Sequence, residues 1–447
     1  MDLEKLFHAI LKPALGCTEP VAVALAVAAA AQASAGWTPG APPPLPAPDA
    51  EDIESVHVRV NKNIFKNAFS IYIPNAEGHK GIVMAAAIGA FGNPELGLEI
   101  FAPVTPPVIE RARALTAAGR VTVEIAEEPL DTDIYIEADV RVRRGTETSA
   151  GGCVIRDKHT RIVRLTRDGR ETFARPPAPA AAGAPEGEIE ALKALDLAGI
   201  VALVEELPPS VEELIRTTIR LNMQVCEAGL AQPMGLGAGF HGAGESEGAD
   251  LAHTVSNLAA AGSDARMAGF PLPVMSSAGS GNQGIIGTMP VVAYARSRGV
   301  GEERLLRAVA LSHLLNMYIT QYVGYLSALC GVAIKAGVGA ACGIAYAMGG
   351  GVTEIGRAVQ IMAATLSGMI CDGAKPGCAL KVSSAADMAT RAAELAMKGM
   401  EVSDDNGIVA PTPEATIRNL AELSRAMGIV DQKIVDIMNQ KIGRLED

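Results

Sequence analysis

Two proline-rich connectors limit the fold of this chain more than any other feature of its sequence. The first reads TPGAPPPLPAPDAED over residues 38–52, and the second reads PPAPAAAGAPEGE over residues 176–188. Proline lacks a backbone N–H and fixes φ, so neither stretch can continue a helix or a central strand. The chain of 447 residues is also too long for one small core. We therefore expect separate segments that begin and end at these connectors.

The segments between the connectors have different hydrophobic periods. Residues 52–175 show the two-residue alternation of half-buried strands, with helical patterns at 80–91 and 106–118. The expected strands are SVHVRVNKNIF, AFSIYIP, VTVEIAEE, DIYIEADVRVRR and RIVRLTRDGRETFAR. Helical periods prevail in residues 1–45 and 187–447. We expect a mainly α-helical catalytic domain built from both of these chain ends, with an inserted α+β domain at residues 52–175.

Composition and charge exclude several classes of partner. Hydrophobic residues make up 49% of the chain but aromatic residues only 4%, which favours closely packed helices with small contact residues. The formal charge is -12 and no Lys/Arg cluster follows a predicted face, so we expect no nucleic-acid partner. The first residues, MDLEKLFHAILKP, lack the pattern of a signal peptide, so we expect a cytoplasmic protein. The apolar stretch 329–352 contains Lys335 and many glycines, which favours buried helices over a membrane span.

Three cysteines lie at glycine-interrupted ends of helical patterns. Cys330, Cys371 and Cys378 are separated by 41 and 7 residues. Glycine and proline in MICDGAKPGCALK, residues 369–381, prevent a regular helix between the last two. A curled loop there could bring both thiolates to one metal cluster. Two other interpretations stay open, namely ordinary buried cysteines and a zinc site of three cysteines with one further ligand.

A fourth cysteine, Cys17, lies in PALGCTEPVAVALA, directly before an apolar helix. A thiol at a helix N-terminus is stabilised as thiolate by the positive end of the dipole. We therefore expect the pKa of Cys17 to fall, which would make it a usable base or nucleophile, with Glu19 as a modifier. A capping turn with a packed cysteine is the alternative interpretation.

Two polar stretches are candidates for substrate binding. In VMSSAGSGNQGIIGTMP, residues 274–290, small and polar residues precede an apolar helix and could hold a carboxylate. The candidates in this loop are Ser277, Gly279, Ser280, Asn282 and Gln283. In NKNIFKNAF the candidates are Asn63, Lys66 and Asn67. A plain loop with a helix cap is the alternative interpretation of the first stretch. For the second, solvation of a strand edge is the alternative and explains any one of its residues more simply.

These motifs together resemble the iron–sulfur L-cysteine desulfidase family, which is related to the alpha region of bacterial iron–sulfur L-serine dehydratases. The shared features are GCTEP, NKNIFKNA, SSAGSGNQGI, LCGVAIKAGVGAACG and GMICDGAKPGCALKVSSAADMA, in this order from about residue 1 to about residue 440. The resemblance implies a [4Fe–4S] cluster held by Cys330, Cys371 and Cys378, with one open iron. It also implies that Cys17 is the base that removes the α-proton of L-cysteine.

The implied reaction is an α,β-elimination that converts L-cysteine to pyruvate, ammonia and sulfide. L-serine dehydration by the same cluster is the nearest alternative. A pyridoxal-phosphate dehydratase is a second alternative, because Lys66, SGNQG and the glycines at 349–351 imitate the order of its motifs. A non-catalytic iron–sulfur sensor is a third. We expect a small amino-acid substrate, no membrane partner and a homodimer, since symmetric dimers are the commonest soluble oligomers.

Overall fold

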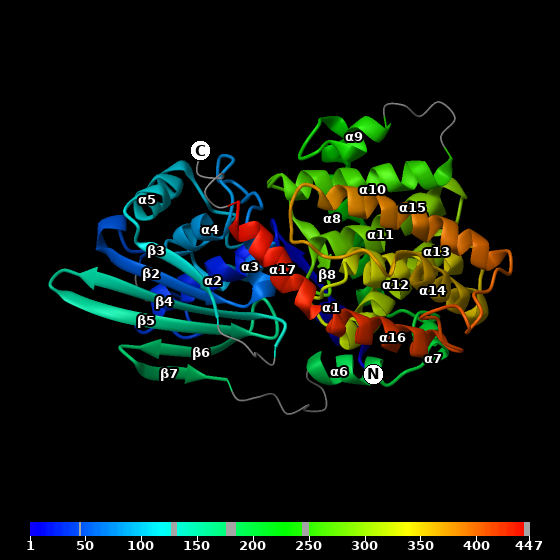
Figure 1. The fold of residues 1–447 in the computed structure, drawn as a ribbon, viewed down its shortest axis with the longest axis horizontal. Coiled ribbons are helices and arrows are strands. Elements are labelled where there is room, and N and C mark those ends of the chain that lie inside the picture. Colours follow the sequence, from blue (N-terminus) through cyan, green and yellow to red (C-terminus); the bar gives the residue numbers. More distant parts are fainter. Residues whose placement is uncertain (44–45, 127–131, 176–184, 244–249, 442–447) are drawn as a thin grey trace.

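The computed structural model describes residues 1–43, 46–126, 132–175, 185–243 and 250–441 (Figure 1). It has two large hydrophobic cores, one inside a helical bundle and one between helices and a sheet. In Figure 1 the sheet lies on the left and the bundle on the right. Between them lie α3 (Lys62–Ala68), α17 (Gly428–Asn439) and β8 (Val274–Ser277). The protein is therefore mainly helical with a sheet region, as the hydrophobic periods predicted.

The sheet unit is built on six strands in the order β3-β2-β4-β5-β6-β7. These strands are β2 (Ile53–Val60), β3 (Val121–Ile125), β4 (Tyr135–Arg144), β5 (Glu147–Arg156), β6 (Ile162–Arg167) and β7 (Arg170–Ala174). Only β2 and β3 pair in parallel, and the other neighbours are antiparallel. Parallel strands need a long crossover. Here it contains α3, α4 (Ile82–Gly89), η2 (Pro94–Glu99) and α5 (Pro106–Ala117), so the two helices predicted at 80–91 and 106–118 are present.

Some predicted strands were wrong. The strand expected in SVHVRVNKNIF ends at Val60, because the side chain of Asn61 accepts a hydrogen bond from the amide of Ile64 at 3.2 Å and caps α3. The stretch AFSIYIP forms only an isolated bridge between Tyr72 and Lys80. Strand β5 was missed because glycines interrupt its alternation. The end of VTVEIAEE falls in residues 127–131, outside the described residues.

Helix α2 (Thr18–Ala33) packs against the sheet and is buried along its whole length. Its alanines allow backbone contact: a Cβ on Gly151 of β5 would lie 2.0 Å from the carbonyl oxygen of Ala30. Helix α1 (Leu3–Ile10) packs in the bundle core instead. The sequence prediction grouped residues 1–45 with the later helices. The packing of α2 differs, because a helix that is apolar on all sides needs cover on all sides, and β4 and β5 of the sheet supply it together with α4 and η2.

The bundle contains α1 and the helices after the second connector, together with a short antiparallel pair of β1 (Leu11–Ala14) and β8. Its other helices are α6 (Pro185–Lys193), α7 (Leu197–Ala202), α8 (Pro209–Ala231), α9 (Ala238–Ala243), α10 (Leu251–Met267), α11 (Gly281–Ser297), α12 (Glu302–Val323), α13 (Val338–Ala347), α14 (Val352–Leu366), α15 (Cys378–Met397) and α16 (Pro413–Ala426). A π-helical turn, η3 (Val332–Gly337), precedes α13. A short 3-10 helix, η1 (Ala50–Asp52), precedes β2.

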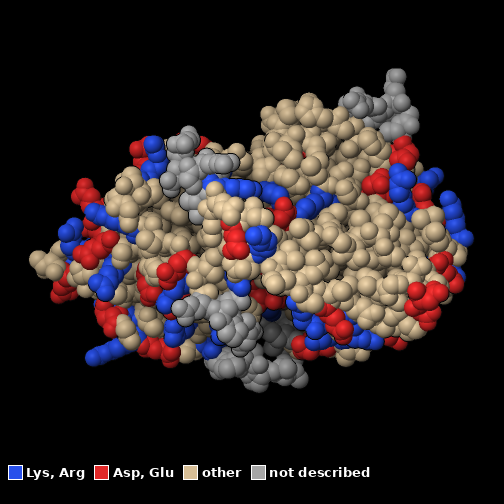
Figure 2. Space-filling model, in the orientation of Figure 1, with Lys and Arg blue, Asp and Glu red and all other residues tan. Residues whose placement is uncertain are grey.

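Charged side chains of both signs are mixed on the surface in Figure 2, and the apolar segment of η3 and α13 is buried. On the face drawn in Figure 2, Lys and Arg are interspersed with Asp and Glu, and no extended area of one sign is visible. The apolar stretch 329–352 forms η3 and α13 inside the bundle core. Within the described ranges, every helix is too short or too polar to cross a membrane.

We predict that Gly151→Ala lowers the free energy of unfolding by about 1–3 kcal/mol, because the new methyl group collides with the backbone of α2 and overpacks the sheet core. Urea denaturation followed by circular dichroism measures the change. Gly301→Ala is the matched control, since a Cβ there meets no atom within 4 Å. Equal stability of the two variants would contradict the close contact between α2 and β5.

Candidate active site

A cavity of about 80 Å³ lies where the sheet unit meets the bundle. The sheet unit contributes Cys17, Glu19, Asn67 and His159, and the bundle contributes Arg266, Gly279, Ser280, Asn282, Gln283, Tyr325, Cys330, Lys335, Cys371 and Cys378. Boundaries between structural units are common places for small-molecule sites. Nine of the residues proposed from the sequence line this one cavity: Cys17, Asn67, Gly279, Ser280, Asn282, Gln283, Cys330, Cys371 and Cys378.

A backbone bridge brings Cys330 next to Cys371. The amide of Cys330 donates to the carbonyl of Met369 at 2.8 Å, and the amide of Cys371 donates to the carbonyl of Ala328 at 2.7 Å. These two bonds flank an antiparallel bridge between Leu329 and Ile370. Two cysteines that are 41 residues apart in sequence are thereby held next to each other at the ends of this bridge. Cys330 is followed by Gly331 and η3, and the loop over residues 372–377 leads from Cys371 to α15.

The loop from Cys371 to Cys378 is non-helical, as the sequence predicted, and Cys378 begins α15. Gly373 has φ +92°, and a Cβ there would lie 2.3 Å from the carbonyl oxygen of Lys66, so the loop packs directly on α3. The same contact brings α3 to the cysteines: Cys371 Sγ lies 4.0 Å from Asn67 Oδ1. Helix α3 of the sheet unit therefore supports the cysteine loop of the bundle.

The three thiols are close enough to influence one another's charge. Burial, followed by the charges of Cys371 and Cys378, raises the pKa of Cys330 to about 12. Burial also raises the pKa of Cys378, against the charge of Lys375. Three thiolates at this position therefore need positive charge beside them, and a bound metal centre would supply it while deprotonating the thiols outright. The donor set suits an iron–sulfur cluster, which cysteine thiolates hold.

Within the part of the chain that the structure describes, no three His, Cys, Asp or Glu side chains are grouped tightly enough for a single metal ion. This is compatible with a cluster, because each cysteine then binds a different iron and the thiolates need not share one ion. Tetrahedral zinc, in contrast, needs all its ligands about 2.3 Å from one centre.

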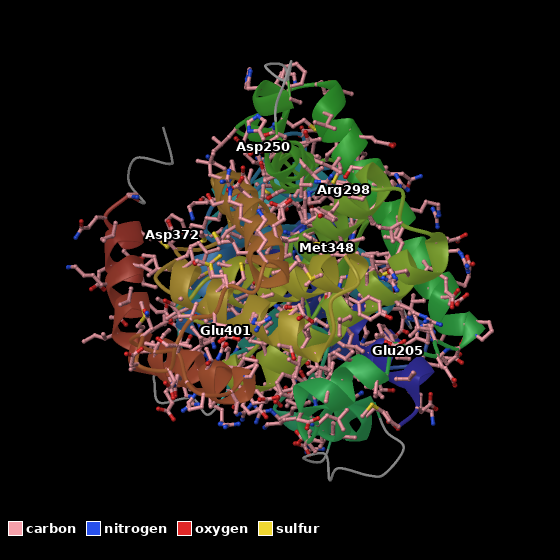
Figure 3. The ribbon with its side chains drawn as sticks, turned by 90° about the vertical axis from the view of Figure 1, so that its right-hand side faces the viewer. Glu205, Asp250, Arg298, Met348, Asp372 and Glu401 are labelled. Carbon is pink, nitrogen blue, oxygen red and sulfur yellow. The ribbon has the colours of Figure 1, made fainter. Side chains whose placement is uncertain are left out.

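Cations surround the cysteine loop. Asp372 lies on the side of the bundle that faces α17 (Figure 3), and Lys375 and Lys381 both donate to its Oδ1. Burial raises the pKa of Asp372, but these two hydrogen bonds outweigh burial and lower it to about 2. On the cavity side, Lys335 is fully buried and donates to the carbonyls of Gly324 and Tyr325 at 2.9 and 3.0 Å. Burial lowers the pKa of Lys335 to about 8.

Cys17 is the N-cap residue of α2, as expected, but the direction of its pKa shift was wrong. Its thiol is buried and donates to Glu19 Oε2 at 2.9 Å. Burial, followed by the charge of Glu19, raises the pKa of Cys17, and the nearby charge of Arg266 only partly opposes this. Desolvation and a neighbouring carboxylate therefore outweigh the helix dipole, because both disfavour the thiolate directly. Cys17 is a protonated thiol with a carboxylate acceptor beside it.

His159 reaches the cavity from the turn between β5 and β6. Its Nε2 lies 3.9 Å from Glu19 Oε1, and its Nδ1 lies 3.2 Å from the position of a Cβ on Gly279. Gly279 has φ +78°, so a side chain there would be strained and would also meet the imidazole. Burial lowers the pKa of His159. The turn of a sheet hairpin therefore closes one side of the cavity against the loop of the bundle.

Part of the serine and glycine loop lines the cavity, and part of it points into the bundle core. Ser280 caps α11 by accepting from the amide of Gln283 at 3.5 Å, and the following side chains line the cavity. Ser277 does not: its hydroxyl meets His313 Nδ1 and Asn316 Nδ2, both at 2.9 Å, inside the bundle. The alternation along β8 turns Ser277 toward α12. Its proposed contact with substrate has no support in this position.

Two candidates from NKNIFKNAF also lie away from the cavity. Lys66 is fully buried, and its Nζ donates to Asp431 Oδ1 of α17 at 2.5 Å. Asn63 does not line the cavity, and its carbonyl accepts from the side chain of Asn67 at 2.9 Å. The helical turn of α3 points only Asn67 at the cysteines. The ion pair between Lys66 and Asp431 instead links α17 to the sheet unit.

Arg266, His159 and Lys335 line the cavity but were not proposed from the sequence. Lys335 could have been identified from the sequence, because a lysine in an otherwise apolar stretch must be paired or functional. Arg266 could have been identified in the same way, because it lies in the alanine-rich run LAAAGSDARMAG. His159 could not have been identified from the sequence, since RDKHTR reads as an ordinary polar turn. Only the packing of the β5–β6 hairpin brings His159 to the cavity.

Comparisons with known proteins agree on one family. A family model described as the serine dehydratase alpha chain matches residues 136–436. The UPF0597 protein of Oleidesulfovibrio alaskensis is 40% identical over 443 residues, which cover 98% of this chain and 97% of that protein. The UPF0597 protein of Geobacter sulfurreducens is 38% identical over 448 residues, 98% of each chain. The UPF0597 protein YhaM of Escherichia coli is 38% identical over 439 residues, 96% of this chain and 95% of that protein.

We predict that His313 makes the protein sensitive to mild acid. Burial lowers the pKa of His313 to about 3, whereas an unfolded histidine titrates near 6.5. Between these values the unfolded chain binds a proton that the folded one does not. Acidification should therefore lower the free energy of unfolding by about 1.4 kcal/mol per pH unit.

Urea denaturation at about pH 7 and about pH 5 measures this loss. His313→Gln should flatten the dependence, while His8→Gln, at an exposed position on α1, should leave it unchanged. The same slope in wild type and His313→Gln would show that another group carries the acid sensitivity.

Proposed function

This chain belongs to the serine dehydratase alpha-chain family, and we propose that it is an iron–sulfur lyase that converts L-cysteine to pyruvate, ammonia and sulfide. The observation that carries the proposal is the composition of one small buried cavity. Cys330, Cys371 and Cys378 line it together with Cys17, and Cys17 has a carboxylate partner. The cavity thus combines a set of three thiol ligands with a candidate proton acceptor.

In this proposal Cys330, Cys371 and Cys378 hold a [4Fe–4S] cluster. Three cysteines leave one of four irons without a protein thiolate, and such an iron supplies a Lewis acid for a thiolate or hydroxyl leaving group. The bridge between Leu329 and Ile370 would hold two of these ligands side by side. Lys375 and Lys381, bound to Asp372, add positive charge next to the thiolates.

Cys17 and Glu19 move the proton. At rest the thiol of Cys17 donates to Glu19 Oε2. When Glu19 takes that proton, Cys17 Sγ becomes a thiolate that can remove the α-proton of the substrate. Loss of the β-sulfur then leaves aminoacrylate, which tautomerises and is hydrolysed by water to pyruvate and ammonia. The hydroxyl of Thr18 also donates to Glu19 Oε2, at 3.2 Å, and holds the carboxylate toward Cys17.

Burial makes this chemistry effective. The side chains that would handle the proton are almost removed from water, with Cys17 3% exposed and Glu19 7% exposed. Electrostatic interactions are stronger in such a low-dielectric site than in water. A base whose pKa is raised by its surroundings binds the abstracted proton more firmly once it becomes a thiolate.

L-serine dehydration is the second candidate function, and the description of the matching family favours it. The same base and the same three cysteines would serve, with hydroxide in place of sulfide as leaving group. The GCTEP sequence around Cys17 is the feature that favours cysteine as the substrate. A soft thiolate also suits an iron–sulfur centre.

The other two alternatives have less support. A pyridoxal-phosphate enzyme would need Lys66, SGNQG and the glycines at 349–351 around one site, yet Lys66 is paired with Asp431 and neither Lys66 nor 349–351 lines the cavity. A non-catalytic sensor would not account for a buried thiol and carboxylate facing the cluster ligands.

Anaerobic assay of the reconstituted protein tests the function. We expect a brown protein with about four irons per chain that forms sulfide and pyruvate in equal amounts from L-cysteine. Cys371→Ser should lose iron, whereas Cys226→Ala, a buried cysteine outside the cavity, should keep it. Pyruvate from L-serine and none from L-cysteine would make the protein a serine dehydratase instead.

Cys17→Ser separates the base from the cluster ligands. We expect this variant to keep its iron and to lose turnover by about 10²–10⁴-fold, the usual contribution of a general base. Glu19→Gln should act in the same direction. Cys153→Ser, buried in the sheet core, is the matched control and should stay active. Loss of iron in Cys17→Ser would contradict the separate roles of Cys17 and the three ligands.

A further inference from the structure

Arg266 is a buried cation that forms no ion pair with any residue the structure describes. Only 4% of the residue is exposed, although it carries a permanent charge. One terminal nitrogen donates to the carbonyl of Gly16 at 3.0 Å, and Nε has no hydrogen-bond partner. Among the described residues, no carboxylate oxygen lies within 4.0 Å of the guanidinium. A buried charge is costly unless it is paired, so this arrangement indicates an anionic ligand.

The guanidinium also lies against the N-terminus of α11. A Cβ on Gly281, the first residue of that helix, would lie 2.2 Å from Arg266 Nε and 2.7 Å from its Cζ. The first amides of a helix have no partner inside it, and the dipole makes that end positive. Helix α11 is 17 residues long, so this end is well developed. Arg266 therefore lies directly beside the positive end of α11, and both Arg266 and the flanking residues Ser280 and Asn282 line the cavity. An anion in the cavity next to them would interact with both positive groups.

The next two side chains of α11 complete the environment. Asn282 and Gln283 are each 5% exposed and line the cavity. Asn282 Oδ1 and Gln283 Oε1 are buried acceptors without a hydrogen-bond partner. Acceptors of this kind suit an ammonium group. Cationic and acceptor groups thus lie next to each other, in the arrangement that a zwitterion requires.

We propose that Arg266 and the N-terminus of α11 bind the α-carboxylate of an α-amino acid, while the amide oxygens of Asn282 and Gln283 bind its ammonium group. The inference rests on the proposed function only in taking an amino acid as the ligand. Lys335 is not an equivalent partner, because its Nζ already donates to the carbonyls of Gly324 and Tyr325. Arginine also matches a carboxylate better than lysine does, since its planar fork can donate twice.

The same guanidinium links the proposed carboxylate site to Cys17, the proposed base, through a hydrogen bond to the backbone. Arg266 donates to Gly16, the residue directly before Cys17. Gly16 has φ +80°, and a Cβ there would lie 2.6 Å from the ring of Pro74, so this turn is fixed against the sheet unit. A carboxylate bound to Arg266 therefore keeps a constant position relative to Cys17 Sγ. Arg266 is in this way a binding residue that also orients the α-carbon toward the base.

Equilibrium binding of L-alanine tests the proposal without turnover, because L-alanine has no β-leaving group. Anaerobic calorimetry of the reconstituted protein should detect binding of L-alanine and little or no binding of L-alaninamide, which has the same shape but no carboxylate. Arg266→Gln should weaken L-alanine binding at least 50-fold and abolish this discrimination. Arg266→Lys should retain part of the affinity. Guanidinium ion added to Arg266→Ala should restore part of the lost binding, which a merely structural role would not predict.

Arg298→Gln is the matched control, because Arg298 follows the opposite end of α11 and lies well away from Asp372 in Figure 3. It should bind L-alanine like wild type. Equal affinity of the wild type for L-alanine and L-alaninamide would overturn the proposal even if no variant folds. Unchanged L-alanine binding in Arg266→Gln would also overturn it. If L-alanine binding depends on Arg266 but no amino acid is converted, the carboxylate site stands and the proposed elimination fails.

Discussion

The backbone bridge between residues 328–330 and 369–371 is the constraint on which the rest of the site depends. It fixes Cys330 beside Cys371 through main-chain hydrogen bonds, which do not depend on the side chains they position. The third cysteine follows from the same geometry, because the loop after Cys371 packs on α3 at Gly373 before α15 begins at Cys378. The three cysteines are thus positioned by the fold of the bundle and supported from outside by the sheet unit.

The meeting of the two units determines the electrostatics of the cavity. Neither unit encloses the cavity alone, since Cys17, Glu19 and His159 come from one side and Arg266, Lys335 and the cysteines from the other. Burial raises the pKa of Cys17, Cys330 and Cys378 and lowers those of His159 and Lys335, so each of these groups is shifted toward its neutral form. Arginine cannot respond in this way, because its pKa is too high. Arg266 therefore stays charged and needs a counter-charge.

The site was predictable from the sequence where residue type alone limits the chemistry. Cysteines at breaker-rich helix ends, Cys17 at the start of an apolar helix and the polar loop before α11 all line the cavity. The prediction was less successful where orientation decides. Ser277 and Gln283 belong to one motif but point in different directions. Strand β8 turns Ser277 into the core, and helix α11 turns Gln283 into the cavity. Lys66 and Asn67 are adjacent in sequence, but the turn of α3 points their side chains in different directions. Lys66 forms an ion pair with Asp431, and Asn67 contacts Cys371.

By itself the sequence determined the mainly helical character of this protein, the presence of a strand-rich middle segment, the identity of the thiol groups and the acidic charge, because periodicity and composition act locally. The tertiary structure alone decided that α2 covers the sheet, that Cys17 is a protonated thiol beside Glu19, and that Arg266 faces the N-terminus of α11. The reason is that burial and charge environment arise from contacts between residues up to hundreds of positions apart. Such contacts leave no periodic trace in the chain.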